Sequence, residues 1–209
     1  MTIIEDGMLR CSVCQSRMRL VCQLKRMRFL PVKVQEEIYF KTVIAAVMYA
    51  ITVWGTCPPA LFEDLEKIHV RAAKIIHQIP SYTDKGKTMN TVRWDSLDYT
   101  YKRKILAVMH KFQNKTIPEA FHDHFKDRLS HSRDGCSLKI PRILRKIGRT
   151  SVIYRGTFLW STVSLETRNS CSLQQFKNKI QRDRKLITLL SFRKEACLIR
   201  NKKEDFEYF

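Results

Sequence analysis

Hydrophobic residues recur at helical spacing along the first part of the chain. Residues 8–29 place cysteine, methionine and valine side chains three and four positions apart, which predicts an amphipathic helix. Pro31 suits the first turn of a second helix over residues 32–54. This second segment is so apolar that we expect a mostly buried helix, ended by Gly55.

A third helix is predicted after Thr56, because the following Pro58 and Pro59 suit a helix start and Pro80 suits its end. Its apolar positions form one stripe, which consists of Leu61, Leu65, Ile68, Ala72, Ile75 and Ile79. Three helices joined by such short connections predict a compact bundle.

The remaining pattern predicts one loop and two more helices. Residues 81–90 are polar and contain one glycine, so we expect a loop there. A fourth helix should end near Asn114, with Trp94, Leu97, Tyr101, Ile105, Val108, Met109 and Phe112 at helical spacing. A last helix should run from Ser172 to beyond Leu190, with Leu173, Phe176, Ile180 and Ile187 on one face.

Residues 137–155 have a different pattern. Apolar and basic residues alternate over short runs around Gly148, which predicts a small two-stranded β-ribbon. We therefore expect a mainly α fold in two domains. The first is a helical bundle over residues 1–130, and the second is the basic β-ribbon with a C-terminal helix over residues 131–209.

The net charge of the chain indicates what kind of partner it binds. The 209 residues include 39 Lys and Arg against 20 Asp and Glu, a formal net charge of +19. Residues 1–100 carry 14 basic and 10 acidic residues, whereas residues 101–209 carry 25 and 10. Such a field concentrates polyanions, of which nucleic acid is the most common.

A membrane partner is not expected. The longest apolar stretch, residues 42–54, has 13 residues, whereas a helix needs ~20 to cross a bilayer. The N-terminal residues lack the basic and then apolar pattern of a secretory signal. Seven cysteines with irregular gaps are typical of free thiols in a reducing compartment, so we expect the nucleus or the cytoplasm.

Metal and cofactor sites are weakly indicated. Cys11, Cys14 and Cys22 have spacing that zinc thiolates use, but they share one helix face, which favours core packing. A mononuclear site could be formed by His122 and His124 with Asp123 and Asp127, but a solvated loop or helix end explains them better. For His69 and His77, eight residues apart on the third predicted helix, packing or surface placement is the default interpretation. No phosphate-binding glycine loop, nucleophile elbow or pair of adjacent aspartates is present. We expect no cofactor, no metal and no catalytic residue.

The acid-free run around the predicted ribbon is the strongest candidate site. Its Arg142, Arg145, Lys146, Arg149 and Arg155 suit phosphate oxygens, and Tyr154 and Trp160 lie nearby as possible stacking surfaces for bases. A solvated charged face is the simpler explanation of any such run. The excess of basic residues over half the chain favours nucleic-acid contact instead.

Several stretches of the sequence resemble a known family. Residues 26–55 are similar to the segment that follows the polymerase domain in reverse transcriptases of LINE-type (non-LTR) retrotransposons, with matches at Leu30, Pro31, Tyr49, Ala50, Val53, Trp54 and Gly55. Residues 65–118 continue the match through Leu65, Arg71, Ala72, Lys74, Ile75, Trp94, Leu97, Lys111 and Pro118. Later matches, in the same order as in the family, are Tyr154, Arg155, Gly156, Trp160, Leu165, Ser172, Leu173, Phe176 and Lys177.

The resemblance covers residues 17–184 and implies a role for them. Ser161 stands where the family has asparagine and Glu166 where it has proline, which suggests relaxed constraint. The family's palm, with its catalytic aspartates, would precede residue 1, and no part of the chain matches it or the endonuclease domain. What remains is similar to the thumb and C-terminal region of this RNA-directed DNA polymerase, which implies a grip on template RNA and primer duplex.

We therefore expect a non-catalytic protein that binds RNA or DNA largely without sequence specificity, with the polymerase palm as a further partner. The contact residues we predict are Lys25, Arg26, Arg28, Arg142, Arg145, Lys146, Arg149, Arg155, Lys177 and Arg184. Three alternatives stay open: a fragment of an active reverse transcriptase, an interaction module for an acidic protein, and a non-functional transposon remnant.

Overall fold

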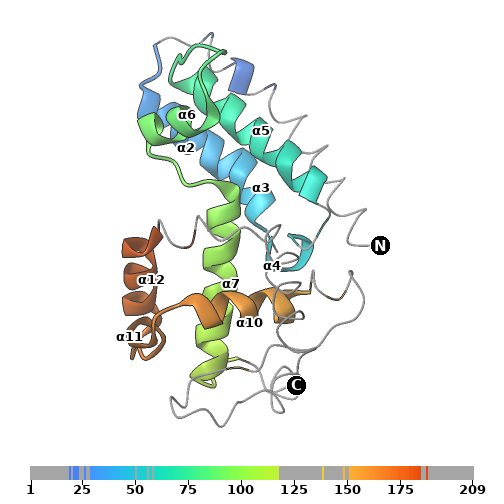
Figure 1. Ribbon diagram of the computed structural model, residues 1–209. Coiled ribbons are helices and arrows are strands. Elements are labelled where there is room, and N and C mark those ends of the chain that lie inside the picture. Colours follow the sequence, from blue (N-terminus) through green and yellow to red (C-terminus); the bar gives the residue numbers. More distant parts are fainter. Residues whose placement is uncertain are drawn as a thin grey trace. The chain divides into compact units, whose positions relative to one another are not determined.

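The computed structural model describes residues 19, 21–23, 26, 29–49, 51–55, 57, 59–117, 138, 148, 151–184 and 187. Helices dominate these residues, which confirms the mainly α fold (Figure 1). The chain divides into two compact units, residues 1–101 and 102–209. Helix α7 contains this boundary, whereas the sequence placed a division after residue 130, which lies outside the described residues.

The predicted helix over residues 32–54 is broken into pieces. Helix α2 (Val32–Tyr39) continues through a π-helical turn, η1 (Phe40–Ile44), into α3 (Ala45–Met48), and α4 (Ile51–Trp54) follows. The break lies at Tyr49, whose ψ of 123° is extended. Its carbonyl oxygen accepts a hydrogen bond from the Trp54 indole at 2.9 Å, so the side chain of the next helix stabilises the break.

One face of this segment is exposed, so the expectation of a mostly buried helix was wrong. Tyr39, Val43, Val47, Ile51 and Trp54 are buried at spacings of three and four residues. Other large apolar side chains of the segment are exposed, namely those of Val32, Val34, Phe40, Tyr49 and Val53. The high hydrophobicity of the sequence therefore does not come from burial on all sides.

Helix α5 (Pro59–Ile76) is the predicted third helix, with Leu65 and Ala72 of its stripe fully buried. It ends three residues earlier than Ile79 because Gln78 adopts a left-handed conformation, with φ of 54°. The Ile79 amide then donates to the Lys74 carbonyl at 2.9 Å, the capping pattern of a Schellman turn, and Pro80 prevents any continuation.

A short helix replaces the loop expected over residues 81–90. Helix α6 (Lys85–Val92) begins after Asp84, whose carboxylate accepts from the Gly86 amide at 2.8 Å. This N-cap holds the pKa of Asp84 below its usual value, because the amide hydrogen bonds favour the charged carboxylate. In the sequence, the capping Asp84 before a polar, glycine-containing stretch is the signal for this helix.

Helix α7 (Leu97–Gln113) starts at Ser96, whose hydroxyl accepts from the Tyr99 amide at 3.1 Å. In the first unit, Trp94 precedes this helix and stacks on Tyr39, with ring centroids 5.2 Å apart and planes 7° from parallel. Tyr101, at the end of the unit, packs against Phe62 of α5. Aromatic rings from α2, α5 and α7 therefore form the centre of the first unit.

Gly55 permits the close approach of α4 and Tyr101. A Cβ atom added there would lie 2.5 Å from the Tyr101 ring and 2.4 Å from the Ile51 carbonyl oxygen. We expect Gly55→Ala to lower the free energy of unfolding by about 1–3 kcal/mol, because a buried ring and a backbone atom must both move. Urea denaturation measures this change. At Gly86 of α6 an added Cβ would lie 3.1 Å from the Asp84 carboxylate, which is the end of an exposed side chain, so Gly86→Ala is the matched control and should change stability clearly less.

Within the described residues of the second unit, three further helices have defined bounds, namely α10 (Val152–Thr162), α11 (Leu165–Arg168) and α12 (Leu173–Arg182). Helix α10 corrects the β-ribbon prediction at residues 152–155, since these residues are helical. The physical reason is Ser151, whose hydroxyl accepts from the Tyr154 amide and caps the helix. Of the rest of the predicted ribbon, the structure describes Leu138, which forms an isolated β-bridge, Gly148, which is helical, and Ser151, and no strand occurs among the described residues.

The core of the second unit joins α7, α10 and α12. Gly156 of α10 lies against Met109 of α7, where an added Cβ would be 2.6 Å from the Met109 sulfur. Phe176 of α12 lies between His110 and Trp160, at ring-centroid distances of 4.4 and 5.6 Å. These contacts fix one face of α12 and leave the opposite face toward solvent. Across the described ranges, no helix combines the length and the hydropathy that crossing a membrane requires.

Candidate nucleic-acid interface

The predicted contact residues fall into three groups. Lys25, Arg28, Arg142, Arg145, Lys146 and Arg149 lie outside the described residues. Arg26 and Lys177 are exposed, and Arg184 is half-buried just after α12. Arg155 is a correction, because it lies in α10 with 8% of its surface exposed rather than on an open ribbon.

The described basic residues are concentrated in the second unit. From residue 102 onward, the described residues include 11 Lys and Arg against 2 Asp and Glu. In the first unit the corresponding numbers are 10 and 8. The excess of positive charge seen in the sequence is therefore also present in the ordered helices of the second unit, although Lys102 and Arg155 are buried there.

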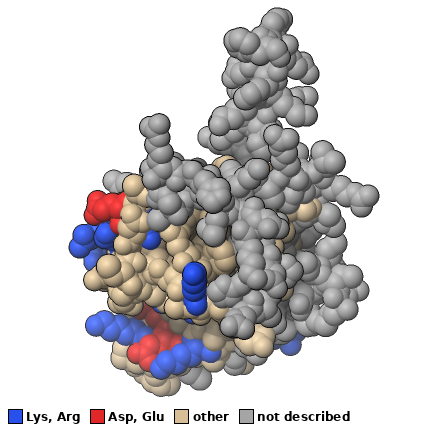
Figure 2. Space-filling model, turned by 90° about the horizontal axis from the view of Figure 1, so that it is seen from below, with Lys and Arg blue, Asp and Glu red and all other residues tan. Residues whose placement is uncertain are grey.

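Several lysines of the first unit are paired. Lys41 contacts Glu37 at 2.9 Å, Lys67 contacts Asp64 at 2.8 Å, and Lys85 contacts Glu66 at 3.4 Å. Figure 2 shows basic side chains at separate places on one face of the described surface, with acidic side chains beside them in two places. Paired cations have less net attraction for a polyanion, so the first unit is the weaker candidate.

Helix α12 carries the clearest unpaired basic surface. Ser172 caps its start by accepting from the Gln175 amide at 3.2 Å. Phe176 and Ile180 are 0% and 1% exposed, which defines the buried face. The exposed residues of the helix are Gln174, Gln175, Lys177, Asn178, Gln181 and Arg182, and no acidic residue lies between Leu173 and Arg182.

The lysines and arginines of α12 differ in their surroundings. Lys179 is tied to α11, since its ammonium lies 3.4 Å from the Glu166 carboxylate and donates to the Glu166 carbonyl at 3.0 Å. Lys177 and Arg182 have no ion-pair partner within the described residues. They are the cations of this helix best placed to meet phosphate oxygens.

Sequence reasoning found Lys177 and missed Arg182. Both residues belong to the last predicted helix. To tell which of its cations are exposed to a ligand, one must know which face of the helix is buried. With Phe176 and Ile180 on that face, Arg182 lies on the opposite side of the cylinder at 100° per residue. The spacing of the apolar residues in the sequence contained this signal.

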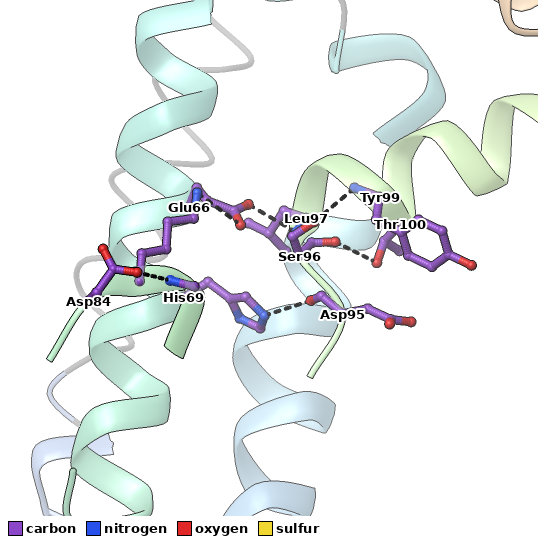
Figure 3. Close-up of polar contacts among 10 residues, drawn as sticks. Glu66, His69, Asp84, Asp95, Ser96, Leu97, Tyr99 and Thr100 are labelled. Atoms are coloured by element: carbon purple, nitrogen blue, oxygen red, sulfur yellow. Dashed lines mark hydrogen bonds and ion pairs between the residues drawn. The ribbon is translucent and has the colours of Figure 1, made fainter. Parts of the chain in front are cut away.

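A second polar cluster lies in the first unit and has a structural role (Figure 3). Glu66 of α5 is 4% exposed and accepts from the Leu97 amide at 2.9 Å, which caps the start of α7. Burial raises the pKa of Glu66, while Lys85 and the Leu97 amide lower it to a smaller extent. The carboxylate therefore serves the helix terminus and does not face a binding surface.

The charge and the hydrogen bond of Glu66 have separable effects. We expect Glu66→Gln to keep or raise stability at pH 7, because the amide oxygen still accepts from Leu97 and no charge is buried. Glu66→Ala should cost about 1–3 kcal/mol by leaving the buried Leu97 amide without an acceptor. Urea denaturation of both variants checks this, and equal losses in the two would contradict it.

His69 is the centre of a buried hydrogen-bond chain beside Glu66. Its Nε2–H donates to the Asp95 carbonyl at 3.1 Å, so Nδ1 accepts from the Tyr39 hydroxyl at 2.8 Å. Burial lowers the pKa of His69 to about 4, which keeps the ring neutral. The chain connects α2, α5 and the segment before α7.

Glu36 and His77 form a further contact at the surface of the same unit. One Glu36 oxygen accepts from the Trp94 indole at 2.8 Å and lies 3.0 Å from His77 Nε2. An open groove of about 480 Å³ runs over this contact, lined by Lys33, Glu36, Glu37, Phe40, Lys41 and Trp94. Its charges are of both signs and partly paired, so it has no clear preference for an anionic or a cationic ligand.

No group of three or more potential metal ligands occurs within the ranges that the structure describes. Cys11, Cys14 and the histidines at 122 and 124 lie outside those ranges. Cys22 is exposed, so the core packing expected of it was wrong. His69 and His77 are in contact with Tyr39 and Glu36 instead, as the packing interpretation expected.

Comparison of the chain with protein-family models, with curated proteins and with solved structures finds no match.

Proposed function

We propose that this protein binds nucleic acid through phosphate contacts and performs no catalysis itself. The observation that carries the proposal is the exposed face of α12, where Lys177 and Arg182 stand among amide side chains with no acidic residue. Arginine, lysine, asparagine and glutamine are the side chains that supply phosphate contacts in known complexes. The surrounding unit has 11 described basic residues against 2 acidic ones, which adds long-range attraction.

The resemblance to LINE-type reverse transcriptases supports the same proposal independently. It implies that the chain corresponds to the thumb and C-terminal region, which holds template RNA and primer duplex next to the polymerase palm. Lys177 belongs both to the resembling motif and to the exposed face of α12. In this proposal Lys177, Arg182 and Arg184 are contact residues, Arg26 is a further contact residue, and Arg155 is removed because it is buried.

A filter-binding titration of the full chain tests the proposal. We expect RNA and DNA duplexes of unrelated sequence to bind at low salt, with affinities that fall steeply as salt rises. Polyglutamate of equal charge serves as competitor, because it distinguishes nucleic acid from an acidic protein partner. Absence of binding at low salt would overturn the proposal, and displacement by polyglutamate at equal charge concentration would favour the acidic-protein alternative.

A further inference from the structure

The exposed face of α12 has an ordered arrangement of amides and cations. Gln174, Asn178 and Gln181 follow one another at spacings of four and three residues, so they form a row along the helix. Lys177 and Lys179 are the neighbours of Asn178 on either side and therefore lie about 100° around the cylinder from it in opposite directions. A row of amides is thus flanked by a lysine on each side.

Two of these amides already contact each other. The Gln174 amide nitrogen donates to the Asn178 side-chain oxygen at 3.3 Å. The pair is left with an N–H donor on Asn178 and an oxygen acceptor on Gln174. Adenine presents the complementary pattern, an acceptor at N7 and a donor at N6, on the major-groove edge of a base pair.

The position of α12 leaves this row accessible. The ring of Phe176 stacks on His110 of α7, and Ile180 is buried, so this side of α12 is fixed against the rest of the second unit. Gln174, Asn178 and Gln181 are exposed on the opposite side. A helix is about 10–12 Å across, which matches the major groove of B-form DNA at about 12 Å wide.

We propose that α12 enters the major groove of B-form duplex DNA, with the row of Gln174, Asn178 and Gln181 at the base edges and Lys177 and Lys179 at the two phosphate backbones. This inference rests on the proposed nucleic-acid binding and goes beyond it, because it adds a preference for sequence and for duplex form. Duplex RNA is the disfavoured ligand, since its major groove is too deep and narrow for side chains to read the bases. Lys179 would exchange its exposed Glu166 partner for phosphate.

The test starts from selection on a random-sequence DNA duplex pool, followed by anisotropy titrations with the full chain. We expect the selected duplexes to be enriched in adenine and to bind at least about tenfold more tightly than a scrambled duplex. An RNA duplex of the selected sequence should bind as weakly as the scrambled DNA. Absence of any selected sequence, or equal binding of RNA and DNA duplexes, would overturn the inference while leaving phosphate binding in place.

Variants separate base reading from charge. Gln174→Ala/Asn178→Ala/Gln181→Ala keeps every charge and favours the helix, so it should abolish the preference for the selected duplex and leave the salt dependence unchanged. Lys177→Gln is the matched control, which should weaken selected and scrambled duplexes by the same factor. A triple-alanine variant that keeps its sequence preference, with unchanged circular dichroism, contradicts the role of the amide row. Failure of the wild-type chain to bind any duplex at low salt would instead overturn the proposed function itself.

Discussion

His69→Ala should lower the free energy of unfolding by about 3 kcal/mol. The substitution removes a ring that is 2% exposed and leaves a cavity beside Trp94, whose centroid lies 5.3 Å from that of His69. It also removes the hydrogen bonds of the ring with the Tyr39 hydroxyl and with the Asp95 carbonyl. Urea denaturation at pH 7 gives the change, read from the midpoint at constant slope.

The control for this prediction is His77→Ala on the same helix. The His77 side chain is 22% exposed and contacts Glu36 at the surface, so its loss should cost clearly less. Equal losses for the two histidines, or a loss below about 1 kcal/mol for His69→Ala, would contradict the central place of His69 in the first unit.

The low pKa of His69 also predicts how stability depends on pH. The folded-state pKa of about 4 lies below the ordinary value of 6.5, so this contribution is present above pH 6.5 and is lost as pH falls toward 4. The loss amounts to about 3 kcal/mol. Glu66 has the opposite effect on the pH dependence of stability. Because its pKa is raised in the folded state, its protonation as pH falls increases the free energy of unfolding. In His69→Gln, whose side chain cannot titrate, the free energy of unfolding should fall less between pH 6.5 and 4 than in the wild type.

The second large effect concerns affinity. Lys177→Gln/Arg182→Gln should weaken binding to a nucleic-acid duplex by roughly 100-fold at 0.1 M salt, because each of the two lost phosphate contacts removes about tenfold through counterion release. Both side chains are exposed, so the fold should persist, and equal thermal unfolding of variant and wild type checks this. Anisotropy titration with one duplex measures the ratio of dissociation constants.

The matched control removes the same amount of charge from the first unit. In the wild-type chain Lys41 and Lys67 are paired with the carboxylates of Glu37 and Asp64. Because these charges are already partly neutralised, Lys41→Gln/Lys67→Gln should change the affinity for the duplex by less than about threefold. A similar loss of affinity in both double variants would mean that net charge matters and the position of α12 does not.

Hydrophobic spacing predicted α5, α7 and the buried face of α12, because one face of each packs against its neighbours. The stripe of α5 and the face of α12 with Phe176 and Ile180 follow directly from the sequence. Ile187, which the sequence placed on the same face of a longer helix, is buried but lies beyond the end of α12 at Arg182. The break at Tyr49 was not predictable in this way, because it depends on the Trp54 indole reaching a backbone carbonyl. Local side-chain hydrogen bonds also determine where α6 and α10 begin, since Asp84 and Ser151 cap these helices, which have little hydrophobic periodicity.

The candidate interface was predictable only in part. Lys177 follows from charge and from the family resemblance, but Arg182 requires knowledge of which face of α12 is buried. Arg155 illustrates the opposite case. Its neighbour Gly156 brings α10 against Met109 of α7, and the resulting close packing leaves Arg155 buried in spite of its charge. Charge along a sequence does not distinguish a buried arginine from an exposed one.

The dependence of duplex affinity on salt tests the account most directly. The logarithm of the association constant should fall linearly with the logarithm of salt concentration, and the slope should become shallower by about 2 in Lys177→Gln/Arg182→Gln. This result would show that α12 neutralises phosphates. An unchanged slope in the variant, or no binding of the wild-type chain at low salt, would contradict the account.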